Sequence, residues 1–345
     1  MPRCLLVLAV LAACSDSGSE PALSDAVSLA CPRPGALPFR LSSSGFQSSI
    51  SKMVASEETR NKDEASDTLG NPGGVTASVY ALDGERPSTA PIAYHGEKAR
   101  TQPSGGLLAD PLPGENVSLW YYDPDATMWR SIGSTKTADD GSYDLPSTGF
   151  VAPSGRPIYA MLEADGSCAA HYDYLFPPGS KVVVTDIDGT LTLSDNELFM
   201  QLGDEAYVPK LMPAADRLMQ AWATKGYPIV YLTARPHSQR AESRGWLTDL
   251  KFPDGPLITA GNGAQPDTYK ALWMMRMIQD FGWNVVAVYG NAATDITAYA
   301  SAGIPAEHTF IVGPLSTTSG ITGIPGMDFS AHITGFVAAQ PTNTP

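Results

Sequence analysis

The sequence has few basic residues, few cysteines and little sustained hydrophobicity. It has 22 Lys and Arg residues against 36 Asp and Glu residues, a formal net charge of -14 over 345 residues. This balance argues against broad nucleic-acid binding and against electrostatic recruitment to anionic membranes. The apolar run from Leu5 to Ala13 is too short to span a bilayer. The length suffices for two domains, and 43% hydrophobic residues can supply their cores.

Residues 1–13 are expected to be a secretion signal rather than part of the fold. The apolar run ends in Leu-Ala-Ala-Cys, which resembles the processing site of bacterial lipoproteins. The resemblance implies that Cys14 becomes the lipidated first residue of an exported protein. The anchor would hold that protein at a membrane, on the periplasmic face or the cell surface. A plain cleaved signal with an incidental cysteine is the alternative.

The other cysteines fit an exported protein. The chain has 4 cysteines, of which Cys4 lies inside the predicted signal. If Cys14 is acylated, Cys31 and Cys168 remain as an even pair in an oxidising compartment. They either form a disulfide or stay as two thiols.

Residues 14–73 are rich in Ser, Gly, Pro and charge and are predicted to be a tether, with a helix around Ser48 to Arg60. Residues 74–176 contain short alternating segments rich in β-branched and aromatic residues, such as NVSLWYYD. In this range Asp139-Asp140-Gly141 is expected to be a turn between two short strands. The pattern predicts a small β-sandwich domain.

Residues 177–340 change to alternating strands and helices. Continuous apolar strands are expected at 181–187, 228–234, 255–260, 284–290 and 309–313. Helices are expected at 213–226, 238–250, 267–282 and 293–303. Buried strands that alternate with helices indicate an α/β fold, a doubly wound parallel sheet with helices on both faces.

Polar residues gather where these strands end. Asp186 and Asp188 end the first strand, Thr233 ends the second, Lys270 opens the helix after the third, and Asp295 follows the fourth. In a parallel sheet such residues converge on the carboxyl edge. Two carboxylates at the end of a buried strand are costly unless a cation offsets their charge.

The chemistry of this set favours phosphoryl transfer. Asp186 and Asp295 supply oxygen ligands of the kind that Mg²⁺ prefers. A lysine and a metal ion neutralise a phosphate, one aspartate can attack phosphorus, and the other can exchange protons. A calcium-binding loop is the alternative for DIDGTLTLSDNE, but Leu191 stands where that loop needs glycine and a strand precedes it.

These elements resemble the haloacid dehalogenase (HAD) superfamily of phosphohydrolases. DIDGTLTLSD, YLTARPHSQRAESRGWL and YGNAATDITAYASAGIP are similar to segments of the C-terminal, LNS-type catalytic domain of lipins, which are Mg²⁺-dependent phosphatidate phosphatases. A related domain closes the membrane-associated phosphatidylinositol transfer proteins. The resemblance covers about Lys181 to Pro314 and does not include the N-terminal lipin domain. It implies a HAD-like Rossmannoid fold.

The resemblance also assigns roles. Asp186 would be the nucleophile and Asp188 the general acid/base, while Thr233 and Lys270 would bind phosphate. Further metal and substrate contacts are expected from Asp295, Asn291, the Asp188 carbonyl, Gly189, Thr190, Ala234 and Arg235. Neither the interval from Asp188 to Thr233 nor that from Thr233 to Lys270 holds a large cap domain, which indicates an open site.

The sequence therefore predicts a Mg²⁺-dependent phosphomonoester hydrolase, most simply one that acts on a membrane lipid such as phosphatidate. The alternatives are a phosphatidate-binding module without turnover and a HAD phosphatase with a soluble substrate. No nucleic-acid partner is expected, and the sequence gives no indication of oligomeric state.

Overall fold

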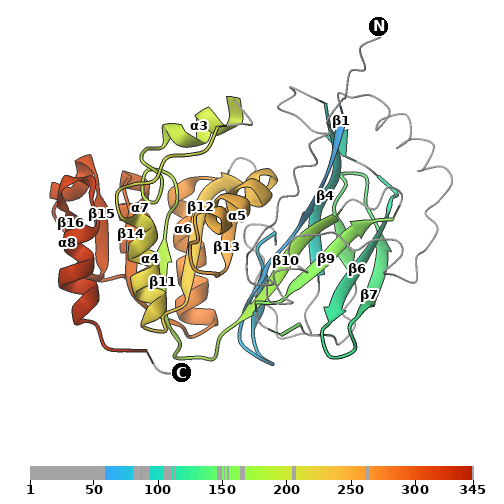
Figure 1. Cartoon of the computed structure of the whole chain (residues 1–345), viewed down its shortest axis with the longest axis horizontal. Coiled ribbons are helices and arrows are strands. Elements are labelled where there is room, and N and C mark those ends of the chain that lie inside the picture. The colour runs from blue at the N-terminus through green and yellow to red at the C-terminus, as the bar shows by residue number, and fades with distance from the viewer. Residues whose placement is uncertain are drawn as a thin grey trace, which may run out of the picture.

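A computed structural model shows that the protein has two lobes (Figure 1). It describes residues 59–343, apart from gaps at 81–86, 88–93, 104–109, 112, 146–149, 151, 154, 164–167, 204–206 and 262–263. The predicted signal and the lipidation residue Cys14 lie outside this range and stay predictions. Cys168 is disulfide-bonded, whereas the other three cysteines lie outside the described residues, so its pairing with Cys31 also stays a prediction.

The N-terminal lobe is a β-sandwich. One sheet contains β1 (Thr59–Ala65), β4 (Tyr94–Pro103), β5 (Asp110–Pro111) and β8 (Tyr143–Leu145), with β4 pairing with the other three. The second has the order β3 (Thr76–Ser78), β2 (Thr68–Gly70), β10 (Cys168–Leu175), β9 (Pro157–Leu162), β6 (Asn116–Asp123) and β7 (Met128–Lys136). Buried residues of β6, β8 and β9 form a core shared by the two sheets.

Two features of this lobe differ from the sequence-based expectation. Strands β1 and β2 lie within the range assigned to the tether, and Thr59 and Arg60, the end of the predicted helix, begin β1. The β1 sequence TRNKDEA is highly charged and lacks the alternating apolar residues that predict a strand. Its antiparallel pairing with β4 defines it as one. The turn at Asp139-Asp140-Gly141 is present, but β7 and β8 on either side of it belong to different sheets.

The C-terminal lobe is the predicted α/β fold. Its sheet has the order β13 (Leu257–Ala260), β12 (Ile229–Pro236), β11 (Lys181–Thr185), β14 (Asn284–Gly290), β15 (Thr309–Val312) and β16 (Thr322–Ile324). Every pair of neighbouring strands is parallel. β11, which precedes the two aspartates, therefore lies in the middle, and the strands beside it end at the same edge.

Among the described residues, the helices of this lobe are α3 (Asn196–Gly203), α4 (Ala215–Thr224), α5 (Arg240–Asp249), α6 (Pro266–Met275), α7 (Ala293–Ser301) and α8 (Ser330–His332). The four predicted helices correspond to α4, α5, α6 and α7, whereas α3 and α8 were not predicted. A 3-10 turn, η2 (His237–Gln239), precedes α5, and α6 continues as a π-helical segment, η3 (Arg276–Asp280). Within the described residues, none of the helices combines the length and hydropathy required to cross a membrane.

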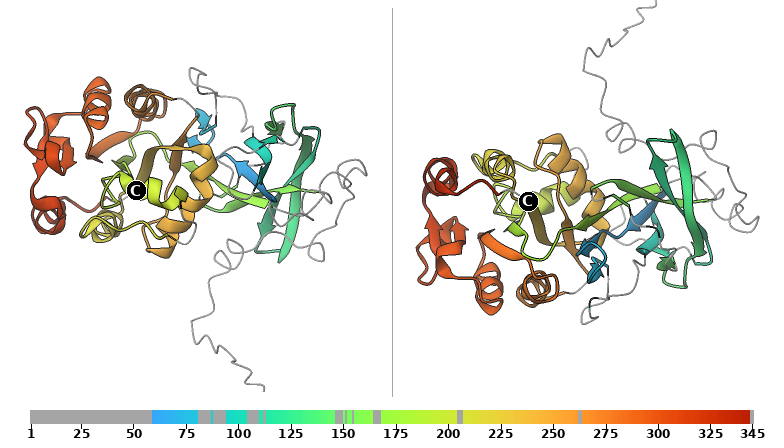
Figure 2. Two further views of the ribbon diagram at one scale, coloured as in Figure 1. Left: turned by 90° about the horizontal axis from the view of Figure 1, so that it is seen from above. Right: turned by 90° about the horizontal axis from the view of Figure 1, so that it is seen from below.

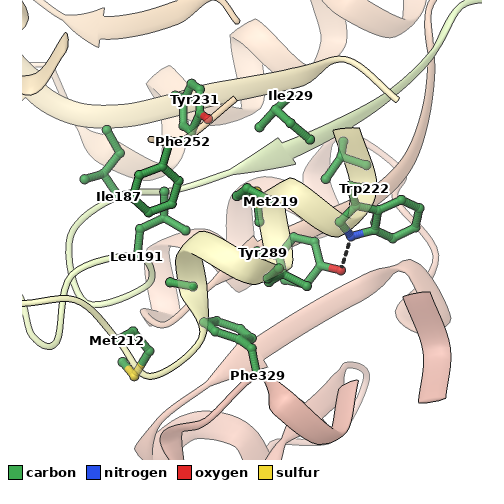
Figure 3. Close-up of a cluster of buried hydrophobic side chains, with 14 of the residues drawn as sticks. Ile187, Leu191, Met212, Met219, Trp222, Ile229, Tyr231, Phe252, Tyr289 and Phe329 are labelled. Atoms are coloured by element: carbon green, nitrogen blue, oxygen red, sulfur yellow. Dashed lines mark hydrogen bonds between the residues drawn. The ribbon is translucent and has the colours of Figure 1, made fainter. Parts of the chain in front are cut away.

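One face of the sheet packs against α4, α5 and the C-terminal segment. Figure 3 shows this cluster, with Met219 and Trp222 of α4 beside Ile229, Tyr231 and Tyr289 of the sheet. The indole N–H of Trp222 donates a hydrogen bond to the Tyr289 hydroxyl at 2.8 Å. This bond satisfies two polar groups that would otherwise be buried unpaired.

The other face of the sheet shares its core with the sandwich. Val182 and Val184 of β11 point to this side, where they join buried side chains of α6 and α7. Leu69, Ala77 and Val79, from β2 and the segment around β3, belong to the same cluster. The two lobes therefore meet through a continuous apolar core, and Figure 2 shows them joined side by side from above and below.

Candidate active site

Lys270 joins two of the predicted site carboxylates at the carboxyl edge of the sheet. Its Nζ lies 2.7 Å from Asp186 Oδ1 and 2.6 Å from Asp295 Oδ1. All three side chains are almost completely buried. Asp186 directly follows β11, and its N–H donates to the Tyr289 carbonyl of β14 at 3.0 Å. The strand ends thus bring together residues that are far apart in the chain, as predicted.

The start of α7 holds Asp295 in place. Its Oδ2 accepts the backbone N–H groups of Asn291 and Ala292, each at 3.0 Å. Ala292 is the N-cap residue of α7 and Asn291 precedes it, so Asp295 accepts these bonds at a helix N-terminus, where unpaired N–H groups and the helix dipole favour a carboxylate. Asp295 is therefore oriented by the backbone on one oxygen and by Lys270 on the other.

Burial changes the acid–base properties of the pair. Burial is the main reason that the pKa of Asp186 is raised to about 7; the charge of Lys270 opposes this rise, and the negative charges of Asp295 and Asp188 contribute to it. Burial tends to lower the pKa of Lys270, but Asp186 and Asp295 outweigh it and raise that pKa above its ordinary value. Asp186 thus holds its proton more tightly than usual while the lysine remains charged.

Asp188 has a different partner. Arg235 binds both of its carboxylate oxygens, with Nη2 2.7 Å from Oδ1 and Nε 2.9 Å from Oδ2. The Arg235 side chain is fully buried, whereas that of Asp188 is 16% exposed. Of the two aspartates in the Asp-Ile-Asp motif, Asp188 therefore has more access to solvent and to a bound ligand.

Further contacts fix Arg235 and the neighbouring Thr233. Arg235 Nη1 donates to Ser243 Oγ of α5 at 3.0 Å and approaches Gln201 Oε1 of α3 at 3.4 Å. The Thr233 hydroxyl oxygen accepts the Arg235 N–H at 3.2 Å and lies 3.4 Å from Asp188 Oδ2. Thr233 therefore lies in the cluster, on the side of Asp188.

The turn after β11 is closed by side chains. Gly189 has a φ of +69°, and a Cβ atom at this position would lie 2.1 Å from Asn291 Nδ2. Asn291 Oδ1 accepts the Thr190 hydroxyl at 3.1 Å, and its Nδ2 donates to Asp195 at 3.1 Å. Only a residue without a side chain fits between this turn and Asn291.

Helix α3 lies beside the cluster, and it has polar side chains on its inner face and exposed apolar side chains on its outer face. Its polar residues Glu197 and Gln201, one turn apart, are buried or half-buried, whereas Phe199 and Met200 are 66% and 52% exposed. Glu197 accepts hydrogen bonds from the Tyr207 hydroxyl at 2.7 Å and the Lys210 N–H at 2.8 Å. Polar contacts therefore attach α3 to the molecule, and Phe199 and Met200 face outward.

The structure thus brings together the predicted catalytic and metal-binding residues Asp186, Asp188, Thr233, Lys270, Asn291 and Asp295. The predicted substrate contacts differ in access, since Ala234 is exposed while Gly189, Thr190 and Arg235 are buried. The sequence reasoning missed the Arg235–Asp188 pair and the support from Ser243 and Gln201. The TAR motif places Arg235 two residues after Thr233, but no pattern identified its partner.

The oxygen-rich donor set suits a hard cation. Asp186 Oδ2 meets the Thr190 hydroxyl at 3.5 Å, which is long for a hydrogen bond, so this oxygen retains lone pairs for another ligand. Three carboxylates face two cationic side chains, which leaves negative charge to offset. No three His, Cys, Asp or Glu side chains within the described ranges are grouped closely enough to form a metal site by themselves.

The parallel sheet and this arrangement at its carboxyl edge define a HAD-like α/β domain. More particularly, residues 183–313 match the family model of the LNS2 domain of PITM 1-3. This match confirms the resemblance to the lipin and phosphatidylinositol transfer protein group for that part of the chain.

Curated relatives agree with this match. The chain is 29% identical over 206 residues to membrane-associated phosphatidylinositol transfer protein 3 of Mus musculus, covering 59% of the chain and 20% of the relative. It is 28% identical over 233 residues to protein retinal degeneration B of Drosophila melanogaster, covering 66% of the chain and 18% of that relative. The matched stretches span about a fifth of these relatives. They are longer than the chain from Val183 to its end, so they include residues of the sandwich.

Solved structures that match part of the chain include phosphatases. Phosphoserine phosphatase in its apo form has 12% identity and a TM-score of 0.34, covering 45% of this chain and 98% of that chain. The cobalt-bound deoxy-D-mannose-octulosonate 8-phosphate phosphatase of Haemophilus influenzae has 17% identity and a TM-score of 0.32, covering 45% of this chain and 85% of that one.

Proposed function

We propose that the protein is a Mg²⁺-dependent phosphomonoester hydrolase that acts on a lipid phosphate such as phosphatidate. The observation that carries the proposal is the contact of Lys270 with both Asp186 and Asp295, next to the partly exposed Asp188. A nucleophile, a proton donor and a buried cation lie together at one sheet edge. A phosphate group placed among them would meet groups able to attack it, neutralise it and protonate its leaving group.

The residues divide the reaction into two displacements. An Asp186 oxygen attacks phosphorus, the bond to the leaving alkoxide breaks, and Asp188 donates a proton to that oxygen, leaving an acyl phosphate on Asp186. Asp188, now ionised, takes a proton from water, which attacks phosphorus and releases inorganic phosphate and the Asp186 carboxylate. Lys270 and the Thr233 hydroxyl would bind the phosphate oxygens and stabilise their charge.

Magnesium fits the donors of this site. Asp186, Asp295, Asn291 and the Asp188 carbonyl oxygen would hold it, since these are the hard oxygen ligands that Mg²⁺ prefers. When bound, the ion would supply positive charge that offsets the buried carboxylates and polarises a phosphate oxygen.

The surface around the site favours a lipid as the substrate. Phe199 and Met200 of α3, with Val208 shortly after it, are three of the five most exposed large apolar residues among the described ones. Exposed apolar groups near a site suit contact with a lipid surface better than with water. The predicted lipid on Cys14 would hold the domain at that surface, so its acidic charge would not prevent docking.

Phosphate release from phosphatidate in mixed micelles, with and without Mg²⁺, tests the proposal on the chain from residue 15 onward. We expect Mg²⁺-dependent release that is lost in Asp186→Asn, and a phosphorylated protein that Asp186→Asn cannot form. Asp216→Asn, at a half-buried aspartate of α4 outside the site, serves as the matched control. Absence of release under all these conditions would contradict hydrolysis.

A second candidate function is lipid binding without turnover. It is supported by the names of the relatives, which are phosphatidylinositol transfer proteins. Phosphatidate-dependent binding to vesicles without phosphate release would favour it. Release from a soluble phosphate ester but not from phosphatidate would instead indicate a soluble substrate. The anchor is tested separately, because Cys14→Ala should move the full-length protein from the membrane fraction to the soluble fraction.

A further inference from the structure

We infer that the β-sandwich positions the general acid/base Asp188, and that Asp67 at the interface of the lobes is the residue through which it does so. The inference rests on the proposed function and assigns a role to the lobe that the phosphatase chemistry does not use. It follows a continuous set of contacts from the sandwich to Asp188.

The first contact is an ion-pair cluster between the lobes. Asp67, in the connection between β1 and β2, is fully buried. One of its oxygens binds Arg240 Nη2, and the other lies 3.1 Å from Arg244 Nη2. Both arginines belong to α5 and stand four residues apart, on the same side of the helix. A buried carboxylate between two arginines is strongly tied to them, because either charge alone would be buried unpaired.

Backbone groups of the sandwich hold two members of this cluster. Asp67 Oδ1 accepts the Tyr172 N–H at 2.8 Å, and Arg240 Nη1 donates to the Ala170 carbonyl at 2.7 Å. Both of these groups are on β10. Helix α5 is therefore fixed to β10, a central strand of the second sandwich sheet.

The second contact runs from α5 to the site. Ser243 lies between the two arginines in sequence and is fully buried. Its hydroxyl oxygen accepts Arg235 Nη1 at 3.0 Å, and Arg235 in turn binds both oxygens of Asp188. A shift of α5 would move Ser243, and Arg235 would lose the hydroxyl that accepts the hydrogen bond from its Nη1.

The segment between Arg235 and α5 is also held by the sandwich. The His237 ring lies tilted against the ring of Tyr80, with centroids 4.2 Å apart, and its Nδ1 lies 2.7 Å from the Thr259 hydroxyl of β13. The chain between Arg235 and Arg244 is thus contacted by the N-terminal lobe at two places, by Tyr80 and by Asp67. Asp67 acts as a positioning residue, since it touches neither the phosphate site nor its carboxylates.

The leaving group separates positioning of Asp188 from a general structural role. An alkyl phosphate needs a proton on its leaving oxygen, whereas p-nitrophenyl phosphate has a leaving group that departs without one. In Asp67→Asn we expect kcat/KM for hexyl phosphate to fall roughly tenfold or more, since general acid catalysis is worth about 10²–10⁴-fold. We expect kcat/KM for p-nitrophenyl phosphate to change by less than about threefold, because that reaction does not use the acid.

A second variant and a control keep the test independent of folding. Ser243→Ala leaves the ion pairs of Asp67 intact and should give the same selective loss. Tyr174→Phe removes another hydrogen bond between the lobes, to Asp254 at 2.8 Å, and should give no selective loss. Equal losses with both substrates, or no loss in Asp67→Asn with an unchanged melting temperature, would overturn the inference. If the unaltered protein releases phosphate neither from these esters nor from phosphatidate, the proposed function itself is wrong and the inference falls with it.

Discussion

Arg235 holds Asp188 by both carboxylate oxygens, at 2.7 Å and 2.9 Å, in a position that solvent can reach. A guanidinium matches a carboxylate with two parallel hydrogen bonds, which fixes direction as well as distance. A lysine would keep the charge but lose this geometry. We therefore expect Arg235→Lys to lower kcat for an alkyl phosphate by ~10- to 100-fold with little change in KM, because Asp188 would transfer protons less effectively. Steady-state kinetics would measure this loss. Lys251→Arg, an exchange at an exposed lysine, is the control and should leave kcat unchanged. An unchanged kcat would contradict the role of the pair.

Gly189 should tolerate no side chain. An alanine there would have a Cβ atom 2.1 Å from Asn291 Nδ2, and its backbone φ of +69° is unfavourable for a residue with a side chain. We expect Gly189→Ala to displace Asn291 and remove most activity. Gly303→Ala is the matched control, because Gly303 has a φ of +78° but nothing within 4 Å of its added Cβ. That control should lose about 1–2 kcal/mol of stability and keep its activity. Similar activities in both variants would show that the contact with Asn291 is unimportant.

The exposed face of α3 should matter only for substrates within a lipid surface. The double variant Phe199→Ser and Met200→Ser removes apolar groups that contact solvent, so folding should be unaffected. We expect slower hydrolysis of phosphatidate in vesicles and an unchanged rate on a soluble phosphate ester. Met128→Ser, at an exposed methionine of the sandwich, is the control. Equal effects on both substrates would argue against contact between α3 and the lipid.

Removing Lys270 should destabilise the protein in a way that a divalent cation corrects. The lysine is buried with Asp186 and Asp295, and Lys270→Met would leave two carboxylates without their cation. Breaking a buried pair in this way costs about 3–5 kcal/mol. Denaturant unfolding in EDTA should reveal this loss, and Mg²⁺ should restore part of it while activity stays low. A loss that Mg²⁺ does not change would contradict metal binding beside Lys270.

His237 should contribute to acid sensitivity. Burial, with a smaller contribution from the nearby charge of Arg240, lowers its pKa from 6.5 to about 3. Because the unfolded chain binds the proton more readily, the stability from neutral His237 is present above pH 6.5 and is lost as the pH falls toward 3. We expect His237→Gln to unfold with a smaller loss of stability between pH 6.5 and 4 than the unaltered protein. Parallel stability curves would show that His237 does not titrate in this way.

The sequence was most informative where geometry follows from topology. Apolar runs located the strands, and parallel strands bring their ends to one edge, so Asp186, Thr233, Lys270 and Asp295 could be grouped without coordinates. The direction of individual side chains could not be obtained in this way. Arg235 was expected at the substrate, yet it is buried against Asp188, since the rotamer that reaches this partner depends on packing by Ser243 and α5.

The first strands of the sandwich were hidden for a different reason. Strand β1 has the composition of a linker and gains its structure from pairing with β4, a contact that is distant in sequence. Asp67 could not be distinguished from the many acidic residues around it, because its partners Arg240 and Arg244 lie more than 170 positions later. Long-range ion pairs leave no local pattern in a single sequence.

The apolar core shared by the two lobes has a consequence for how this gene could be divided. Leu69, Ala77 and Val79 cover the same face of the sheet as α6 and α7. A truncated protein that begins at β11 would therefore expose this apolar surface to water and be prone to aggregate. The segment that the LNS2 family model delimits is therefore smaller than the unit that can be moved intact. Any recombination event that transferred this domain to a new protein would have had to carry the hairpin of β2 and β3 along with it.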